Sequence, residues 1–377
     1  MMKKHIAFLE FETHAPLLEQ WYLLLKEMQL LDYHFFVSKK VANHLQNIPQ
    51  KHITVLDQIA DFKSQIQHFD AVVVNTFHRH FDQYHFIFRQ KPSMCLVHNM
   101  NFSVFFNPLC IQTIFKEKNR LTYYLKLYIK EKIDSKRKNI LHFTQLAVLS
   151  KALHQELISK NAIAASKTVC LNLNFCETIQ CPPQKPIKIV ISGNISNKRK
   201  DIDLIISVLE ELNPENHLEF EFLGKPENTQ IEKKLIDLET NLHPNVRISY
   251  HQKYIQWDDY QTAISKAHLL LCPIKQQTSF YWVKEKYGHT KMSGNENDCI
   301  VHGKLGLFPS YYPKMEWHNL FYENKSDLIE ILNHLSSDYL QKEYKILQNY
   351  NTSYQFNGVK NQLENQLLTL ASLPQNV

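Results

Sequence analysis

A strand, a glycine turn and a helix follow one another in IKIVI-SGNISNKRK-DIDLIISVLEEL, residues 187–212. The first run is apolar apart from one lysine, as expected for a strand buried in a parallel sheet. Gly193 then opens a polar loop, and Asp201 stands where a helix N-cap belongs. Because this order begins a Rossmann-like domain, we predict that residues 186–350 form one. Further apolar runs continue the pattern at 219–223, 246–250 and 269–272.

The N-terminal half shows the same alternation of short apolar runs and helical patterns. The runs cover residues 5–9, 33–37, 71–74, 93–98 and 146–150. Strands separated by helices imply right-handed βαβ units and a parallel sheet. The connector 180–186 holds three prolines, which exclude a continuous helix or strand. We therefore expect an α/β protein with Rossmann-like domains at 1–180 and 186–350, followed by a helical segment at 351–377.

The composition fits a folded protein without a membrane span or a secretion signal. A chain of 377 residues exceeds one hydrophobic core, and its 44% hydrophobic and 21% charged residues are ordinary for globular domains. No run approaches the roughly 20 apolar residues of a spanning helix. The seven cysteines are odd in number and scattered, as expected for reduced thiols. We expect a cytoplasmic protein.

Residues 116–138 carry nine basic and three acidic side chains, a surplus equal to the net charge of +6 of the whole chain. Aromatic and aliphatic residues recur there at helical spacing, which predicts a basic amphipathic helix. It is either an ordinary surface helix or a face that rests on anionic lipid, peripheral at the inner face of the membrane. No nucleic-acid recognition motif accompanies it, so nucleic acid is not an expected partner.

Acidic and histidine clusters do not predict a metal site. Asp201 and Asp203 have the spacing of a metal-binding pair, but they open a helix, where an N-cap and a first-turn acid explain them. His78, His80 and His85 lie close in sequence, but a chain with 20 histidines forms such groups by chance. We expect no bound metal.

All seven glycines lie in the second half of the chain, and the first 192 residues contain none. Glycine lets a backbone approach a phosphate closely. We therefore expect the phosphate-binding loops in the C-terminal domain, and Gly193 begins the first of them.

The strongest motif is YGHTKMSGNENDCIVHGKLGLFP, residues 287–309, in which a polar loop leads into a short helix and then a glycine turn. Free amides at the start of a helix, together with its dipole, suit a diphosphate. Lys291, Ser293 and Gly294 precede this helix start. They are candidate nucleotide-binding residues.

The same segment resembles the C-terminal domain of bacterial glycosyltransferases of the broad family-4-like GT-B group, in particular a branch with the pattern Tyr-Gly-x-Thr-Lys-x-Ser-Gly followed by an acidic residue. The resemblance implies two Rossmann-like domains that face each other across a cleft, and a C-terminal helix that returns to the N-terminal domain. It implies a hexosyltransferase-like enzyme that is retaining, metal-independent and without a cofactor. The implied substrates are a UDP- or GDP-sugar donor and the hydroxyl of a glycan or lipid-linked acceptor, in the synthesis of a bacterial surface polysaccharide or glycoconjugate.

The resemblance also assigns donor-binding residues. Asp298 matches the acid that binds the ribose hydroxyls, a role that suits a carboxylate because it accepts two hydrogen bonds from a vicinal diol. Arg199 and Lys200 match the basic loop that neutralises the leaving diphosphate, with the planar fork of Arg199 as the central contact. The acid that contacts the donor sugar has no match, since Thr290 stands at its position and Lys291 follows. The motif therefore supports nucleotide binding more firmly than any one sugar.

Three residues of the N-terminal half are candidate catalytic residues. His98 ends an apolar run, and the resemblance places a histidine there, near the donor sugar and the acceptor. It is either a structural histidine or a group that orients the reacting hydroxyl. Glu12 and His14 follow the first run and would border the same site, where either could act as the base that activates the acceptor.

Two other functions are compatible with the sequence. A GT-B-shaped sugar-nucleotide epimerase would use acidic residues on both sides of its site and release free sugar without an acceptor. A catalytically silent partner would bind only a nucleotide or a glycan, and the unmatched sugar-contacting acid is consistent with that role.

Overall fold

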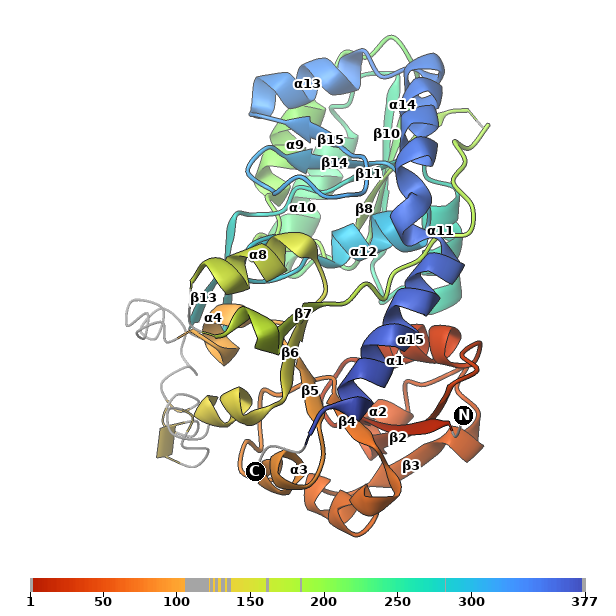
Figure 1. Cartoon of the computed structure of the whole chain (residues 1–377). Helices are drawn as coiled ribbons and strands as arrows, with labels where there is room; N and C mark the ends of the chain where they lie inside the picture. Colours follow the sequence, from red (N-terminus) through yellow and green to blue (C-terminus); the bar gives the residue numbers. More distant parts are fainter. Residues whose placement is uncertain are drawn as a thin grey trace. The chain divides into compact units, whose positions relative to one another are not determined.

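The computed structural model describes residues 3–105, 137–160, 163–183, 185–281 and 283–374, and the single positions 122, 125, 128, 129 and 133. These residues form two compact units (Figure 1). The N-terminal unit comprises Met1–Leu173, Ser279–Met292 and Phe356–Val377, and the C-terminal unit comprises Asn174–Thr278 and Ser293–Gln355. Most of the basic segment 116–138 lies outside the described residues. Across the part of the chain that is described, no helix is long and apolar enough to cross a membrane.

The described residues of the N-terminal unit are built on a seven-stranded parallel sheet in the order β3-β2-β1-β4-β5-β6-β7. The strand order reverses between β1 and β4, which pair directly, with Leu9 opposite Val74. In a doubly wound sheet this switch point forms a crevice at the carboxyl ends of the strands, where ligands bind. The strands are β1 Lys4–Glu10, β2 Leu31–Ser38, β3 Ile53–Leu56, β4 Ala71–Val74, β5 Ser93–Leu96, β6 Gln145–Val148 and β7 Thr168–Cys170.

Helix α1 (Ala15–Leu25) shows why the first βαβ unit forms. Pro16 stands in its first turn, where proline costs no hydrogen bond, and its buried residues recur at helical spacing. The buried ring of Trp21 packs on Phe8 of β1, with ring centroids 4.9 Å apart. The apolar stripe of α1 thus covers β1 and positions the loop that joins the two.

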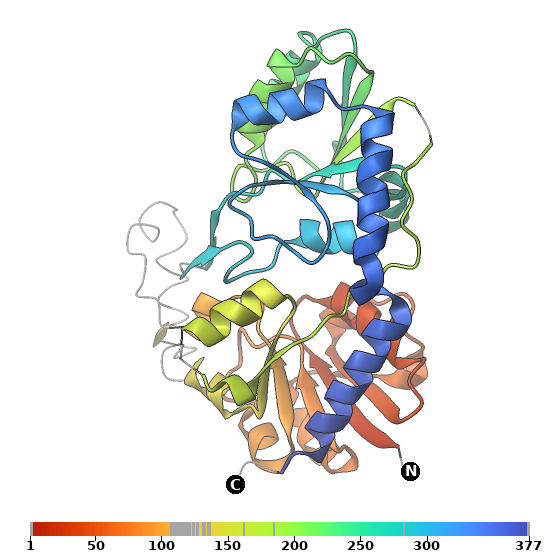
Figure 2. The ribbon, with the colours of Figure 1, turned by 45° about the horizontal axis from the view of Figure 1, so that its top comes forward.

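Helix α15 (Phe356–Ser372), the last helix of the chain, lies beside α1 and β1 of the N-terminal unit (Figure 2). Its Glu364 side chain accepts the amide of Leu30 at 3.0 Å, and its Leu363, Leu367 and Leu370 are buried. The unit also contains α2 Lys39–Ala42, α3 His85–Gln90, α4 Met100–Ser103, α8 Lys151–Ser159 and the 3-10 turns η1 Gln50–His52, η2 Ile59–Ser64, η3 Ile66–His68, η5 Arg137–His142 and η6 Ala165–Lys167.

The C-terminal unit repeats the topology. Its described residues include a six-stranded parallel sheet, β10-β9-β8-β11-β14-β15, whose order reverses between β8 and β11. Asp201 caps the helix that follows β8, as predicted, because its side chain accepts the amide of Leu204 at 3.2 Å. The strands are β8 Ile187–Ser192, β9 Leu218–Leu223, β10 Val246–Tyr250, β11 Leu269–Leu271, β14 Gly306–Pro309 and β15 Leu320–Tyr322. The helical elements are α9 Ile202–Glu211, α10 Thr229–Glu239, α11 Trp257–Ser265, α12 Gly294–Val301, α13 Lys325–Asn333, α14 Ser337–Tyr350 and η7 Asn351–Tyr354.

A hairpin formed by β12 (Gln277–Phe280) and β13 (Val283–Lys286) continues into a loop that packs with the N-terminal unit as far as Met292. Val283 belongs to the hydrophobic core of that unit. The Glu285 carboxylate accepts the amides of Asn101 and Phe102 at 3.3 and 2.9 Å, which satisfies free donors at the start of α4. A buried carboxylate therefore anchors this late segment of the chain.

Candidate functional site

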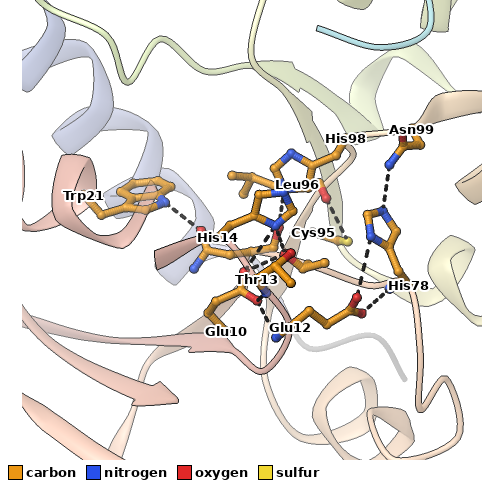
Figure 3. A network of polar contacts seen from close by, with 12 residues as sticks. Glu10, Glu12, Thr13, His14, Trp21, His78, Cys95, Leu96, His98 and Asn99 are labelled. Carbon is orange, nitrogen blue, oxygen red and sulfur yellow. Dashed lines mark hydrogen bonds and ion pairs between the residues drawn. The ribbon is translucent and has the colours of Figure 1, made fainter. Parts of the chain in front are cut away.

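A polar network lies where β1, β4 and β5 end, at the switch point of the N-terminal unit (Figure 3). The carboxyl ends of adjacent parallel strands meet at one edge of the sheet, so residues far apart in sequence converge there. Glu12, His14 and His98, the three candidate catalytic residues, all take part in this network. Glu10 and Thr76 join them at its centre.

Glu10 is a fully buried carboxylate, 0% exposed. Its Oε1 accepts the amides of Glu12 and Thr13 at 2.7 and 3.2 Å, and its Oε2 accepts the Thr76 hydroxyl at 2.5 Å. Thr76 Oγ1 in turn lies 2.7 Å from Nδ1 of His14. Burial raises the pKa of Glu10, and the bond from Thr76 and the two amide bonds oppose that rise.

His14 and His98 stack, with ring centroids 4.2 Å apart and an interplanar angle of 14°. Burial lowers the pKa of His14 to about 4, and the charge of Lys291 acts in the same direction. Burial and the neighbouring His14 lower the pKa of His98 to about 3. Both rings are therefore neutral near pH 7. His98 donates from Nε2 to the Asn75 carbonyl at 2.6 Å, since a carbonyl only accepts.

Glu12 forms a second arm of the network with His78. Its Oε1 accepts the His78 amide at 2.8 Å, and its Oε2 lies 3.8 Å from Nδ1 of the same ring. On the far side of that ring, Asn99 Nδ2 donates to Nε2 at 3.2 Å. Burial raises the pKa of Glu12 to about 7. A carboxyl with this pKa exchanges its proton near neutral pH, as acid–base groups in active sites do.

In the C-terminal unit, Asp298 of α12 lies beside the carboxyl end of β8. Its Oδ2 accepts the hydroxyls of Ser192 and Tyr260 at 2.7 and 2.8 Å. Asn295 Nδ2 donates to the Ser192 hydroxyl at 2.9 Å and braces the group. Burial raises the pKa of Asp298, and these two hydroxyls and Lys200 act against that rise. The carboxylate is thus held in one orientation at the switch point between β8 and β11.

The three basic side chains of the loop after β8 lie in different surroundings. Lys200 is buried and donates from Nζ to the carbonyls of Ser192 and Asn194, and burial lowers its pKa to about 8. Lys198 forms an ion pair with Glu227. Arg199 is exposed. Lys200 therefore shapes the loop from within, while the guanidinium of Arg199 is accessible to a ligand.

Two glycines allow the loops after β8 and β9 to touch. Gly193 has a φ of +82°, which disfavours any residue with a side chain, and a Cβ on Gly224 would stand 2.4 Å from the Gly193 carbonyl oxygen. Gly193 thus has a conformational reason to be glycine whether or not a phosphate binds there.

The motif at 287–309 is divided between the units. Lys291 packs with the N-terminal unit, with its Nζ 5.5 Å from the centre of the Phe280 ring. Thr290 is buried there, and its carbonyl accepts the Met100 amide at 2.8 Å. Ser293 and Gly294 belong to the C-terminal unit, where the Ser293 hydroxyl accepts the Asn295 amide and caps α12.

The sequence did not single out Glu10, Thr76, Ser192 or Tyr260. Three of these residues follow or end a strand, which was the available signal, because strand ends form the ligand-binding edge of such sheets. Tyr260 carries no such signal, since it stands inside α11. Among the described residues, no group of three or more His, Cys, Asp or Glu side chains could hold a metal ion.

No family model and no curated protein sequence matches this chain. Many solved structures resemble it, among them the following three, which do so over nearly their whole length. HepE of Anabaena in complex with UDP is 11% identical over 98% of this chain and 100% of its own, with a TM-score of 0.59. The lipopolysaccharide outer core galactosyltransferase WaaB, in its apo form, is 10% identical over 97% and 99%, with a TM-score of 0.56. The N-terminal domain of Candida albicans trehalose-6-phosphate phosphatase is 9% identical over 98% and 100%, with a TM-score of 0.59.

At sequence identities this low, the likeness to these structures shows a shared fold and nothing further. The two large sheets of the described residues are parallel and have the 3-2-1-4-5-6 order of a Rossmann domain, with a seventh strand added in the N-terminal unit. The expectation of an α/β protein with two Rossmann-like domains is confirmed. Together with its structural neighbours, this architecture shows that the chain has the GT-B fold.

Proposed function

We propose that the chain is a glycosyltransferase that moves a sugar from a nucleoside-diphosphate donor to a hydroxyl acceptor. The observation that carries the proposal is the pair of polar sites at the two switch points of a GT-B fold, one around Asp298 and one around Glu10, Glu12, His14 and His98. HepE, which shares the fold, has been solved with UDP and with UDP-glucose. A UDP-sugar is therefore the first donor to test, and a GDP-sugar the second.

The donor is proposed to bind the C-terminal unit. Asp298, oriented by Ser192 and Tyr260, would accept the ribose hydroxyls. The start of α12, at Ser293 and Gly294, and the loop at Gly193 would offer amides to the diphosphate. Arg199 would neutralise the charge that develops on the leaving phosphate, supported by the charge of Lys200. Lys291, a further candidate for binding the nucleotide, packs with the N-terminal unit.

The acceptor is proposed to bind the N-terminal unit. Neutral His14 and His98 would orient the reacting hydroxyl or hydrogen-bond the donor sugar. Glu12, whose pKa burial raises to about 7, would take up the hydroxyl proton. The resemblance found in the sequence adds a hexose donor, retention of the anomeric configuration and independence of a metal or cofactor.

The proposal extends to the synthesis of a bacterial surface polysaccharide or glycoconjugate, with a glycan or lipid-linked acceptor. WaaB, a lipopolysaccharide outer core galactosyltransferase of the same fold, supports this part. A cytoplasmic location and contact with anionic lipid through residues 116–138 belong to the same proposal.

A thermal-shift screen of UDP-, GDP- and CMP-sugars tests the proposal. A donor that binds only the folded state raises the melting temperature by mass action. The stabilising donor is then incubated with and without candidate acceptors, and the products are identified by mass spectrometry. We expect a glycosylated acceptor. Release of a free 2-epimer without an acceptor would identify an epimerase, and binding without turnover would identify a silent partner.

A further inference from the structure

A chain of hydrogen bonds runs from the interior of the N-terminal unit to an accessible imidazole. Glu10 Oε2 and Thr76 Oγ1 are 2.5 Å apart, and Thr76 Oγ1 and His14 Nδ1 are 2.7 Å apart. Glu10 and Thr76 are 0% and 1% exposed, whereas the His14 side chain is 34% exposed. His14 is thus the member of this chain that reaches solvent.

The direction of the hydrogen bonds follows from the groups that surround Glu10. Its Oε1 accepts two backbone amides, at 2.7 and 3.2 Å, and these donors favour the ionised carboxylate. Burial acts in the opposite direction and raises the pKa of Glu10. In its ionised form this carboxyl only accepts, so the single proton of the Thr76 hydroxyl then points to Oε2. The separation of 2.5 Å is typical of a hydroxyl that donates to an ionised oxygen.

The direction of this hydrogen bond also determines the tautomer of His14. With its proton committed to Glu10, Thr76 Oγ1 offers only a lone pair at 2.7 Å, so Nδ1 of His14 must carry the ring proton. Nε2 is then the nitrogen with the lone pair. The ring is uncharged at neutral pH, because burial, and after it the charge of Lys291, hold its pKa near 4.

We propose that Glu10 and Thr76 are positioning residues that act through His14: they keep its proton on Nδ1 and leave Nε2 to accept a hydrogen bond from an acceptor hydroxyl other than the one whose proton Glu12 takes up. This inference rests on the proposed transferase function. It adds a residue pair that touches no substrate and a defined role for one nitrogen atom.

The charge of Glu10 determines which ring nitrogen of His14 carries the proton. A protonated Glu10 would donate to Thr76, the Thr76 hydroxyl would donate to Nδ1, and the ring proton would move to Nε2. Nε2 would then be a donor instead of an acceptor. Glu10→Gln imitates this state permanently, since the amide nitrogen donates to Thr76 while the amide oxygen accepts the two backbone amides.

The groups around His14 keep its ring neutral, so what can change is which ring nitrogen carries the proton. His98 stacks on the ring, is itself neutral, and donates its Nε2 proton to the Asn75 carbonyl. Glu10 Oε2 lies 3.8 Å from Nδ1, and Lys291 contributes a positive charge. Thr76 is the group at hydrogen-bond distance from Nδ1, so its replacement should release the tautomer.

The test is ¹⁵N nuclear magnetic resonance of the full chain with labelled histidine, in which the shifts of the two ring nitrogens report which one is protonated. His14→Gln assigns the signals. We expect the Nδ1-protonated form in the wild type and in Thr76→Ser, and a change to the Nε2-protonated form in Thr76→Val and Glu10→Gln. Melting temperatures verify that each variant is folded, and Thr76→Ser serves as the matched control because it keeps the hydroxyl.

Once a donor and an acceptor are identified, kcat and KM of the same variants provide a second test. Thr76→Val and Glu10→Gln should lower kcat about tenfold, the effect of one lost hydrogen bond, with KM for the donor nearly unchanged. Thr76→Ser should keep kcat near the wild-type value.

Two results overturn the inference: an Nε2-protonated His14 in the wild type at pH 7, or a tautomer that is the same in Thr76→Val. A tautomer that shifts while kcat stays unchanged overturns the role of Nε2. The proposed function fails separately, if no sugar nucleotide is turned over by a wild type whose His14 is Nδ1-protonated.

Discussion

Single residues decide the chemistry of the N-terminal site, and their effect depends on burial. Glu12 and His14 could be chosen from the sequence because they follow an apolar run. Glu10 directly follows the same run, but the run gives no sign that its carboxylate is buried and hydrogen-bonded. Its partner Thr76 is 66 positions away and meets it only when β1 and β4 pair. The convergence of the two is a property of the sheet, which local sequence does not encode.

The pH dependence of activity tests Glu12. As the proton acceptor it must be ionised, and burial raises its pKa to about 7, so kcat/KM should rise with pH up to that value. Glu12→Gln should lower kcat by about 10²-fold and remove this rise. The exposed Glu27→Gln is the matched control. An unchanged inflection near pH 7 in Glu12→Gln would assign it to another group.

Among the elements, strands with a clear apolar pattern and the helices between them could be predicted from the sequence, and three short edge strands could not. The apolar runs at 71–74 and 246–250 coincide with β4 and β10, and the helix after Asp201 forms as expected. The edge strands β3, β7 and β15 were not predicted. They are three or four residues long, too short to show a period of their own.

The contact between the loops after β8 and β9 gives a stability prediction. Gly224→Ala would place a Cβ 2.4 Å from the Gly193 carbonyl oxygen, so backbone must shift at a cost of about 1–3 kcal/mol. Gly294→Ala is the matched control, since nothing lies within 4 Å of its added Cβ. Urea denaturation measures both. Equal stability of the two variants would show that the loops separate freely.

Helix α12 carries a buried acid whose charge opposes folding. Glu296 accepts the Tyr312 hydroxyl at 2.7 Å, and burial raises its pKa from 4.5 to about 7. Because the pKa of Glu296 is higher in the folded state than in the unfolded state, the folded state holds this proton more tightly. Protonated Glu296 therefore adds to the free energy of unfolding, and this contribution is lost as pH rises from about 4.5 through 7.

Glu296→Gln should therefore stabilise the protein at pH 8 by about 1–3 kcal/mol and have little effect near pH 4.5. Melting temperatures across this range measure the difference, with the exposed Glu239→Gln as control. If the melting temperatures of the wild type and Glu296→Gln differ by the same amount at every pH, the raised pKa of Glu296 is contradicted.

The whole molecule is two Rossmann-like units, each with its own sheet and core, and this much followed from the alternation of strands and helices. For the last helix, the resemblance already implied a return to the N-terminal domain. Nothing in the sequence indicated that residues 279–292 pack with the N-terminal unit, through contacts such as Glu285 with the start of α4. Such pairings depend on tertiary packing between distant parts of the chain.

The basic segment 116–138 gives a prediction about the protein as a whole. If it rests on anionic lipid, the protein should sediment with anionic vesicles at low salt and be released near 1 M salt, where the screening length falls to about 3 Å. Vesicles of neutral lipid are the control. Equal and negligible sedimentation with both kinds of vesicle would remove this contact from the proposal.

Isothermal titration with UDP and GDP measures whether the C-terminal unit binds a nucleotide. The wild type should bind at least one of them, and Arg199→Ala and Asp298→Asn should each weaken binding about tenfold or more, the effect of about 1.4 kcal/mol. Arg247→Ala, which removes an exposed arginine of β10, should bind as the wild type does. A wild type that binds neither nucleotide, or three variants that all bind with the wild-type affinity, would contradict the account.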